Sequence, residues 1–374
     1  MKITIATGLY PPEIGGPATY AAMLEAELPD QGFEINTVPF GWVRKYPKVV
    51  RHVVFAWKLW SESKGTSAIY ALDSISVGVP SLLVARLRRV PFLVRLGGDY
   101  AWEQGRMRFG VTATLDAFLE NQDNWPLPVK LLAWVQTFVV SRAKRVVVPS
   151  NYLKGVVEKW GVQADKIQVI YSALFPITVD ATRDELRKHF EYTYPTIVSS
   201  GRLVPWKGFD VLIDVVSGLR AVFPDITLVI VGDGEERQKL EEKVSQLKMA
   251  QHVWFTGSLS KDALGATIKA ADLFVLNTAY EGLSHQLIEV MDIGTPIVTT
   301  RAGGNTELIT DAVNGFLVEF NNAPEMTEVI TRVLNHPESR ERIAQSARLR
   351  SKEFVKEKAI AQIVALLKNL HHGK

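Results

Sequence analysis

The chain reads PTIVSSGRLVPWKGFDVLIDVVSGLRAVFPDITLVIVGDG over residues 195–234. The stretches 195–203 and 225–234 have the length of strands and contain the apolar runs IV and ITLVIV, as strands buried on both faces usually do. The segment between them is long enough for a helix. A strand, a helix and a second strand in this order predict a parallel β–α–β unit.

The same alternation fills both halves of the chain and pauses only around 174–192, which we interpret as a hinge. We therefore predict an α/β protein with two parallel sheets in separate domains. In open parallel sheets ligands bind beyond the carboxyl ends of the strands, so the loops that follow strands are the candidate sites. The predicted strands are 2–7, 33–40, 67–72, 91–97, 145–150 and 166–172, then 195–203, 225–234, 252–259, 272–278, 296–300 and 314–320.

Composition narrows the function classes. The 374 residues suggest two domains, and 47% hydrophobic with 22% charged residues is typical of a globular protein. A net charge of +3 is too even to indicate nucleic-acid binding. The absence of cysteine excludes disulfides and thiolate catalysis. We find no signal peptide and no run long enough to span a membrane, so we expect a cytoplasmic protein.

Glycines follow the first strand in GLYPPEIGGPATY, residues 8–20. Gly15 and Gly16 permit a close backbone approach to a ligand, and Pro17 opens a helix whose amides can receive an anion. A flexible loop before a proline-started helix explains the same residues. The spacing is not G-x-G-x-x-G, which argues against a dinucleotide-binding dehydrogenase.

A second glycine loop, SSGRLVPWKG, follows the first strand of the second half. Gly201 lies beside Arg202, and Lys207 follows. Two cations on one loop can bind a diphosphate and stabilise its charge as a bond to it breaks. A solvated loop with two ordinary basic residues is the alternative. Gly232 and Gly257 end the next two strands, a pattern of low specificity.

The run EGLSHQLIE places two carboxylates, Glu281 and Glu289, around a glycine turn. Gly282, Leu283 and Ser284 offer backbone amides at a helix start, which suit phosphate or sugar oxygens. A carboxylate such as Glu289 can accept both hydroxyls of a ribose. There is no D-x-D motif, and the histidines have no metal-ligand spacing except the terminal pair, so we expect no required metal.

Four stretches together resemble the family 4 retaining glycosyltransferases, which have the GT-B fold. EGLSHQLIEVMDIGTPIVTTRAGGNTELI resembles the family's signature of two glutamates separated by seven residues, and SSGRLVPWKG its phosphate-binding loop. PPEIGGPATY and VVVPSNYLK resemble motifs of its first domain. The resemblance implies two Rossmann-like domains: 1–172 for the acceptor and 173–350 for a nucleotide-sugar, with 351–374 packing back on the first.

The resemblance also implies roles in binding the donor. Arg202 and Lys207 would bind the diphosphate, Glu289 the ribose, and Glu281 would lie near the donor sugar. The glycine loops would approach the phosphates and base, and Gly16 would do so from the first domain. The residues implied to bind the donor are Gly16, Gly201, Gly232, Gly257, Gly282, Leu283, Ser284 and Glu289.

The sequence departs from the family pattern after the fourth strand. Many relatives have a histidine there, beside the donor sugar, whereas this chain has Asp99 in VRLGGDYAWEQ. Asp99 is either an acceptor-side base or the cap of a helix that begins at Tyr100. A second departure is SHQ in place of the commoner glycine-leucine-proline between the two glutamates.

The acceptor is the least defined partner: a glycan, a lipid-linked saccharide or a small molecule. A basic, aromatic segment at 42–60 is typical of helices that lie on an anionic membrane, although a helix packed on the sheet explains it too. Residues 101–109 and 123–128 offer aromatic faces for a carbohydrate. The residues behind the membrane hypothesis are Trp42, Arg44, Lys45, Lys48, Arg51, Trp57, Lys58 and Trp60.

We therefore predict a metal-independent retaining glycosyltransferase, with a hexosyl donor expected and no nucleic-acid partner. Two alternatives remain open. A GT-B hydrolase or epimerase would share the nucleotide loops, and it would release free nucleotide without an acceptor or interconvert nucleotide-sugars. A non-catalytic sugar-nucleotide or glycan-binding protein would keep its function after loss of Glu281.

Overall fold

The computed structural model describes residues 1–13, 15–121 and 124–370, which form two compact units. The first contains Met1–Ser172 and the C-terminal segment from Lys356, and the second contains Ala173–Val355. Ile14, Asp123 and the terminal histidine pair of the sequence analysis lie outside the described residues. Among the described residues, no helix is long and apolar enough to cross a membrane.

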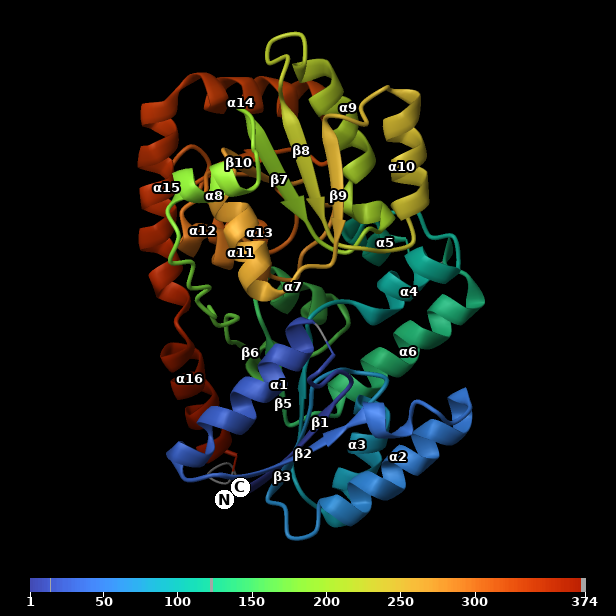
Figure 1. Ribbon diagram of the computed structural model, residues 1–374. Coiled ribbons are helices and arrows are strands. Elements are labelled where there is room, and N and C mark those ends of the chain that lie inside the picture. Colours follow the sequence, from blue (N-terminus) through green and yellow to red (C-terminus); the bar gives the residue numbers. More distant parts are fainter. Residues whose placement is uncertain (14, 122–123, 371–374) are drawn as a thin grey trace. The chain divides into compact units, whose positions relative to one another are not determined.

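The first unit is built on a parallel sheet in the order β2-β1-β3-β4-β5-β6 (Figure 1). The strands β1, β3, β4 and β5 are almost entirely buried, whereas the edge strands β2 and β6 are partly exposed. Burial on both faces is typical of the inner strands of a parallel sheet. The strands are β1 (Lys2–Thr7), β2 (Glu34–Pro39), β3 (Ala68–Ala71), β4 (Phe92–Arg95), β5 (Arg145–Val148) and β6 (Ile167–Val169).

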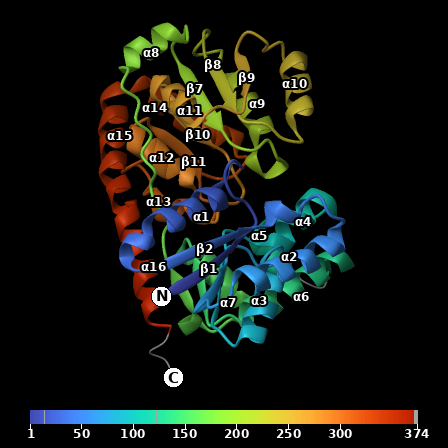
Figure 2. The same cartoon turned by 60° about the horizontal axis from the view of Figure 1, so that its bottom comes forward.

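Helices cover this sheet, and α3 packs against both α2 and α6 (Figures 1 and 2). The C-terminal helix joins the same unit, where Lys356 Nζ lies 2.6 Å from Glu27 Oε1 of α1. The helices are α1 (Gly16–Glu27), α2 (Lys48–Glu62), α3 (Gly78–Arg88), α4 (Tyr100–Arg108), α5 (Leu115–Glu120), α6 (Leu127–Ser141), α7 (Asn151–Lys159) and α16 (Lys356–Lys368). Short 3₁₀ turns are η1 (Pro29–Gln31), η2 (Phe40–Val43) and η4 (Ala164–Lys166).

The second unit repeats the architecture with a parallel sheet in the order β12-β11-β10-β7-β8-β9. Apolar side chains of β7, β8 and β10 form one buried core with those of α9 and α14. The strands are β7 (Thr196–Ser200), β8 (Thr227–Val231), β9 (Val253–Gly257), β10 (Leu273–Leu276), β11 (Ile297–Thr300) and β12 (Phe316–Val318). The helices are α8 (Arg183–His189), α9 (Phe209–Leu219), α10 (Arg237–Gln246), α11 (Lys261–Ala270), α12 (His285–Ile293), α13 (Asn305–Leu308), α14 (Ala323–Asn335) and α15 (Pro337–Ser351), with 3₁₀ turns η5 (Pro205–Lys207) and η6 (Lys352–Phe354).

Each predicted strand is present, so the prediction of two parallel α/β sheets is confirmed. One predicted boundary differs. The C-terminal segment was expected to leave the second domain at 351, whereas residues up to Val355 belong to the second unit. The cause is a backbone hydrogen bond of 2.6 Å from Leu174 N to Phe354 O, which ties η6 to the start of that unit.

The segment 42–60 is also not one helix, as the membrane hypothesis assumed. Trp42 lies in the 3₁₀ turn η2, and α2 begins only after Pro47. Proline is common at a helix start because the amide hydrogen that it lacks would have no acceptor within the helix. The Lys48 side chain lies outside the described residues.

Candidate active site

The second sheet reverses its direction of growth between β7 and β10. The chain moves from β7 outward to β8 and β9, and β10 then pairs with the other side of β7. The loops that follow β7 and β10 therefore leave from neighbouring strands and diverge. Such a point is where open α/β sheets most often bind their ligands.

The two loops are held together by a buried amide. Asn277 Nδ2, just after β10, donates to Gly208 O at 2.8 Å and to Asn321 Oδ1 at 2.8 Å. Gly208 has a left-handed backbone, with φ of +50°, and a Cβ there would lie 2.3 Å from Asn277 Nδ2. Only glycine fits at this position. The hydrogen bond from Asn277 to Gly208 therefore fixes the backbone directly after Lys207, the last residue of η5.

Lys207 and Glu281, one from each loop, form an ion pair. Their side chains are only 15% and 16% exposed, so solvent screens the pair weakly. A cation and a carboxylate thus meet at the switch point of the sheet. Arg202 differs, because it pairs at 3.0 Å with Glu235 and both side chains are about half exposed. Of the two predicted diphosphate ligands, the structure brings only Lys207 to Glu281.

Three of the predicted glycines lie against one another at this edge. The Gly232 amide donates to Gly257 O at 2.9 Å, and the Gly201 amide donates to Val231 O at 3.0 Å. A Cβ on Gly232 would lie 1.9 Å from Gly201 O. The loops after β7, β8 and β9 are therefore packed backbone to backbone, which leaves a surface rich in main-chain amides and carbonyls.

The loop after β10 leads into α12, which begins at His285. Ser284 is its N-cap, with Oγ accepting from the Leu287 amide at 3.3 Å. The Gly304 amide donates to Glu281 O at 2.9 Å, which fixes the backbone before the turn. Gly282, Leu283 and Ser284 thus lie at a helix N-terminus, where amide dipoles favour an anion.

Glu289 lies in the second turn of α12, and its side chain is 21% exposed. Its Oε1 is 3.6 Å from Lys261 Nζ at the start of α11. Burial raises the pKa of the Glu289 carboxyl above its ordinary value, and Lys261 acts in the opposite direction. A carboxylate held at the edge of a buried region, with one cation nearby, is suited to accept hydroxyl hydrogens.

Asp99 lies in the first unit and is 1% exposed. Its Oδ1 accepts from the Trp102 amide at 3.0 Å, so the expectation that it caps a helix from Tyr100 is confirmed. A cap can also act as a base, and that role of Asp99 stays a prediction. The same oxygen accepts from Gln136 Nε2 at 3.2 Å. Burial raises the pKa of the Asp99 carboxyl, while hydrogen bonds from Trp102, Gln136 and the Trp160 indole act against the increase.

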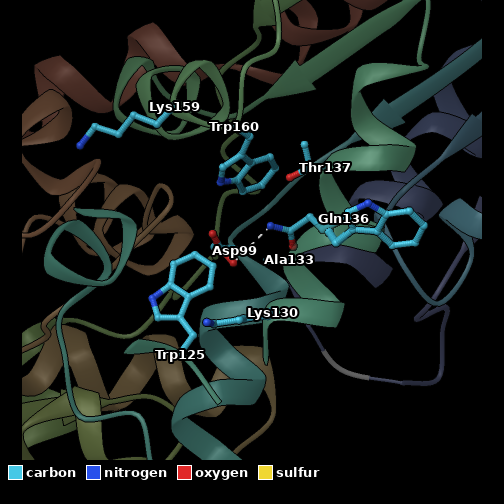
Figure 3. A pocket seen from close by; sticks show the side chains of 9 residues that line it. Asp99, Trp125, Lys130, Ala133, Gln136, Thr137, Lys159 and Trp160 are labelled. Carbon is cyan, nitrogen blue, oxygen red and sulfur yellow. Dashed lines mark hydrogen bonds between the residues drawn. The ribbon is translucent and has the colours of Figure 1, made fainter. Parts of the chain in front are cut away.

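Asp99 also lines a cavity of about 410 Å³ that belongs entirely to the first unit. Figure 3 shows the indoles of Trp125 and Trp160 on two sides of the carboxylate, with Gln136 hydrogen-bonded to it. Trp125 is stacked on Phe118, with ring centroids 3.8 Å apart, and it donates to Phe118 O at 2.9 Å. These contacts fix one wall of the cavity as a flat aromatic surface.

Two family models together match most of the chain. Glycosyltransferase Family 4 matches residues 14–174, and Glycosyl transferases group 1 matches residues 182–350. The chain belongs to the family 4, group 1 glycosyltransferases. Enzymes of this group use nucleotide-sugar donors, and the predicted GT-B fold is confirmed by its structural relatives.

Full-length relatives are distant from this glycosyltransferase. An uncharacterized glycosyltransferase of Methanocaldococcus jannaschii is 23% identical over 96% of each chain. Alpha-D-kanosaminyltransferase of Streptomyces kanamyceticus is 32% identical, but the similarity covers 45% of this chain and 44% of that protein. The crystal structure of Anabaena Alr3699/HepE with UDP-glucose superimposes with a TM-score of 0.79 at 21% identity, covering 99% of this chain and 100% of that one.

Some predicted residues of this glycosyltransferase remain in separate units. Gly16 is the first residue of α1 and, like Asp99, belongs to the first unit, whereas the predicted donor loops belong to the second. The contribution of Gly16 to donor binding therefore stays a prediction. Among the described residues, no cluster of three or more histidine or acidic side chains could hold a metal ion.

Sequence reasoning missed three amide side chains of this glycosyltransferase. Asn277 joins the loops after β7 and β10, Gln286 donates to Ser200 Oγ, and Gln136 donates to Asp99. A signal existed for Gln136, because it is the one amide side chain in the largely apolar sequence of α6, and a buried amide needs a hydrogen-bond partner. The position of Asn277, a polar residue directly after a buried strand, is a weaker indication of a structural hydrogen bond.

Proposed function

We propose that this glycosyltransferase moves a hexosyl unit from a nucleotide-sugar to a saccharide acceptor, with retention of anomeric configuration and without a required metal ion. The observation that carries the proposal is the Lys207–Glu281 pair at the switch point of the second sheet. A partly buried cation there can bind a diphosphate, and the carboxylate beside it can bind the hydroxyls of the attached sugar.

The donor would bind along the glycine edge of the second unit. Its diphosphate would replace Glu281 as the partner of Lys207, with the N-terminus of α12 and Arg202 stabilising the remaining negative charge. Glu289 would accept hydrogen bonds from the ribose. Negative charge grows on the diphosphate as it leaves, and these groups would do the work that a metal ion does elsewhere.

The transfer itself exchanges one bond for another. The acceptor oxygen forms a bond to the anomeric carbon, the bond from that carbon to the diphosphate oxygen breaks, and the diphosphate keeps the electron pair. Retention follows if the acceptor attacks from the face that the diphosphate leaves. We assign the acceptor proton to Asp99, and the departing diphosphate is the alternative base.

The acceptor would occupy the Asp99 cavity. Trp125 and Trp160 offer aromatic faces for a sugar ring, and Asp99 and Gln136 offer polar groups for its hydroxyls. A volume of about 410 Å³ is within the range of small-molecule sites and is large enough for a sugar unit. Both a free glycan and a lipid-linked saccharide fit this description, and the latter motivates the proposed contact of 42–60 with a membrane.

Donor binding is tested by thermal unfolding with UDP-, GDP- and ADP-sugars in the presence of EDTA. We expect one nucleotide to raise the melting temperature, because a ligand at about 100 times its Kd adds about 2.7 kcal/mol to the stability. Arg202→Ala and Glu289→Gln should each reduce the shift. Lys243→Ala, which removes the surface pair between α10 and Asp214, is the control.

If no nucleotide-sugar raised the melting temperature, the proposed donor site would be wrong. If a shift seen without EDTA were abolished by EDTA, the proposed metal independence would be wrong. Release of nucleotide at the same rate with and without an acceptor would favour a hydrolase instead. Interconversion of two nucleotide-sugars would favour an epimerase. Unchanged function in Glu281→Ala would favour a binding protein.

The role of Asp99 predicts a pH dependence. A base must be ionised, and burial raises the Asp99 pKa, so the transfer rate should fall with decreasing pH at a higher pH than a carboxyl with a pKa of about 4 would give. Asparagine is also a good helix cap, so the Asp99→Asn variant should fold. Its kcat should be lower by roughly 10²-fold or more, and the fall in rate at low pH, the acidic limb of the pH profile, should disappear.

Stability gives a second readout for Asp99. A raised pKa in the folded state means that the protonated carboxyl stabilises the fold and that this contribution is lost as pH increases through the raised pKa. The variant should therefore show a smaller decrease in stability over the same pH range. A kcat within threefold of wild type, with the limb retained, would assign the proton to the departing diphosphate.

A further inference from the structure

Helix α2 of the first unit carries apolar side chains on the side that faces solvent. Val49, Val53 and Trp57 follow at intervals of one turn and are 78%, 67% and 69% exposed. The same helix already buries Phe55 and Leu59 completely. The exposed stripe is therefore a second apolar surface, in addition to the one that packs into the fold.

Two neighbouring helices repeat this feature. On α3, Leu83 and Leu87 are 53% and 62% exposed, again one turn apart. On α6, Leu127, Leu131 and Trp134 are 80%, 59% and 62% exposed. Since α3 packs against both α2 and α6, the stripes lie on adjoining helices (Figure 2). We call the exposed side chains named in this and the preceding paragraph the α2–α3–α6 face.

This concentration is unusual for the molecule. Most of the exposed large apolar side chains of the described chain lie between residues 42 and 134, and the remainder are scattered over both units. Isolated exposed apolar residues need no explanation, but stripes on three adjoining helices indicate a surface that binds something.

The charge around the α2–α3–α6 face is strongly positive. Glu62 is the only acidic residue in the sequences of the three helices, although the chain as a whole has 43 basic and 40 acidic residues. Cations lie over exposed aromatic rings of the same region, with Lys58 Nζ 5.2 Å from the Trp42 ring and Arg88 Cζ 4.1 Å from the Trp60 ring. The basic residues on or next to these helices are Arg44, Lys45, Lys48, Arg51, Lys58, Arg86, Arg88, Arg89, Lys130 and Arg142.

We propose that the α2–α3–α6 face binds the surface of an anionic lipid bilayer. Aliphatic and tryptophan side chains enter the boundary between headgroups and acyl chains, and the surrounding lysines and arginines bind lipid phosphates. A second copy of this chain does not complement the face, because it would bring like charges together. The surface extends well beyond residues 42–60, since α3 and α6 also contribute exposed apolar side chains to it.

Trp134 connects this surface to the acceptor cavity. It belongs to the α2–α3–α6 face and also lines the cavity that contains Asp99. A bilayer on this face would therefore lie beside the cavity. This last step rests on the proposed transferase function, and it favours a saccharide carried by a lipid as the acceptor.

The test is flotation of the full chain with vesicles of phosphatidylcholine alone or with 30% phosphatidylglycerol, at low salt and in 0.5 M NaCl. Wild type should partition to the anionic vesicles more strongly by on the order of tenfold or more, and salt should weaken the binding. The double variant Val53→Glu with Leu87→Glu should lose on the order of tenfold in partitioning.

A matched control has the same charge change on the second unit. Val222→Glu with Leu349→Glu alters side chains that are 57% and 68% exposed, and it should bind like wild type. Equal losses in both double variants, or no preference for anionic vesicles, would overturn the proposal. A dimer in solution that the first variant alone dissociates would assign the face to a second copy. The nucleotide-induced thermal shift of each variant, measured separately, shows whether the donor site is intact.

Discussion

Lys207→Ala should lower kcat by roughly 10²–10³-fold, the usual effect of removing one preorganised group that stabilises developing charge. Lys207 is the partly buried cation at the switch point of the second sheet, and the diphosphate gains negative charge as it leaves. The variant also leaves the Glu281 carboxylate without its partner in a site where the side chain is only 16% exposed. Loss of one member of a buried pair is costly for that reason.

The kinetic constants separate two roles of Lys207. If it binds the donor equally in the ground and transition states, KM for the nucleotide-sugar rises and kcat is unchanged; if it acts on the leaving group, kcat falls. Lys243→Ala is the matched control, because Lys243 of α10 pairs with Asp214 of α9 at 2.5 Å, outside the loops that carry the site. A Lys207→Ala enzyme within threefold of wild type in both constants would contradict the assignment of the donor site.

The fold could be predicted because most of its strands are buried on both faces, the exceptions being the edge strands β2, β6 and β9. Continuous apolar runs of strand length, each separated by a helix, gave the location of every strand, and only the ends differ by a few residues. The run 145–150, for example, ends as β5 at Val148 because Ser150 caps α7 by accepting from the Leu153 amide at 3.1 Å. Local competition of this kind decides strand ends and is hard to read from periodicity.

The sequence was sufficient to predict which loops carry the candidate site, but not which of their side chains contact one another. Lys207 and Glu281 are paired because β10 lies beside β7, a neighbour relation between strands that are not consecutive. Sequence spacing does not encode that order. The Lys261–Glu289 pair likewise depends on how α11 and α12 are placed. The α2–α3–α6 face needed exposure values, because a helical pattern cannot tell which of two apolar stripes faces solvent.

Gly232→Ala should destabilise the second unit by about 2–4 kcal/mol and reduce nucleotide binding. The added Cβ would lie 1.9 Å from Gly201 O and 2.9 Å from Gly201 C, so backbone rather than a flexible side chain must move. The residue also has φ of +135°, which an alanine adopts only with strain. Because the Gly232 amide donates to Gly257 O, displacement of this residue disturbs all three glycine loops at once.

Gly218→Ala is the control for this substitution. Gly218 lies in α9, and no atom lies within 4 Å of the position where its Cβ would be. Alanine is favoured over glycine in a helix by about 1 kcal/mol, so this variant should be equal to wild type or slightly more stable. Urea unfolding followed by tryptophan fluorescence, with the nucleotide-induced thermal shift, measures both effects. If the two variants unfolded at the same urea concentration, the close backbone contact between the loops after β7 and β8 would be wrong. If Gly232→Ala were destabilised but bound nucleotide normally, the contact would be right and the donor would not use this edge of the sheet.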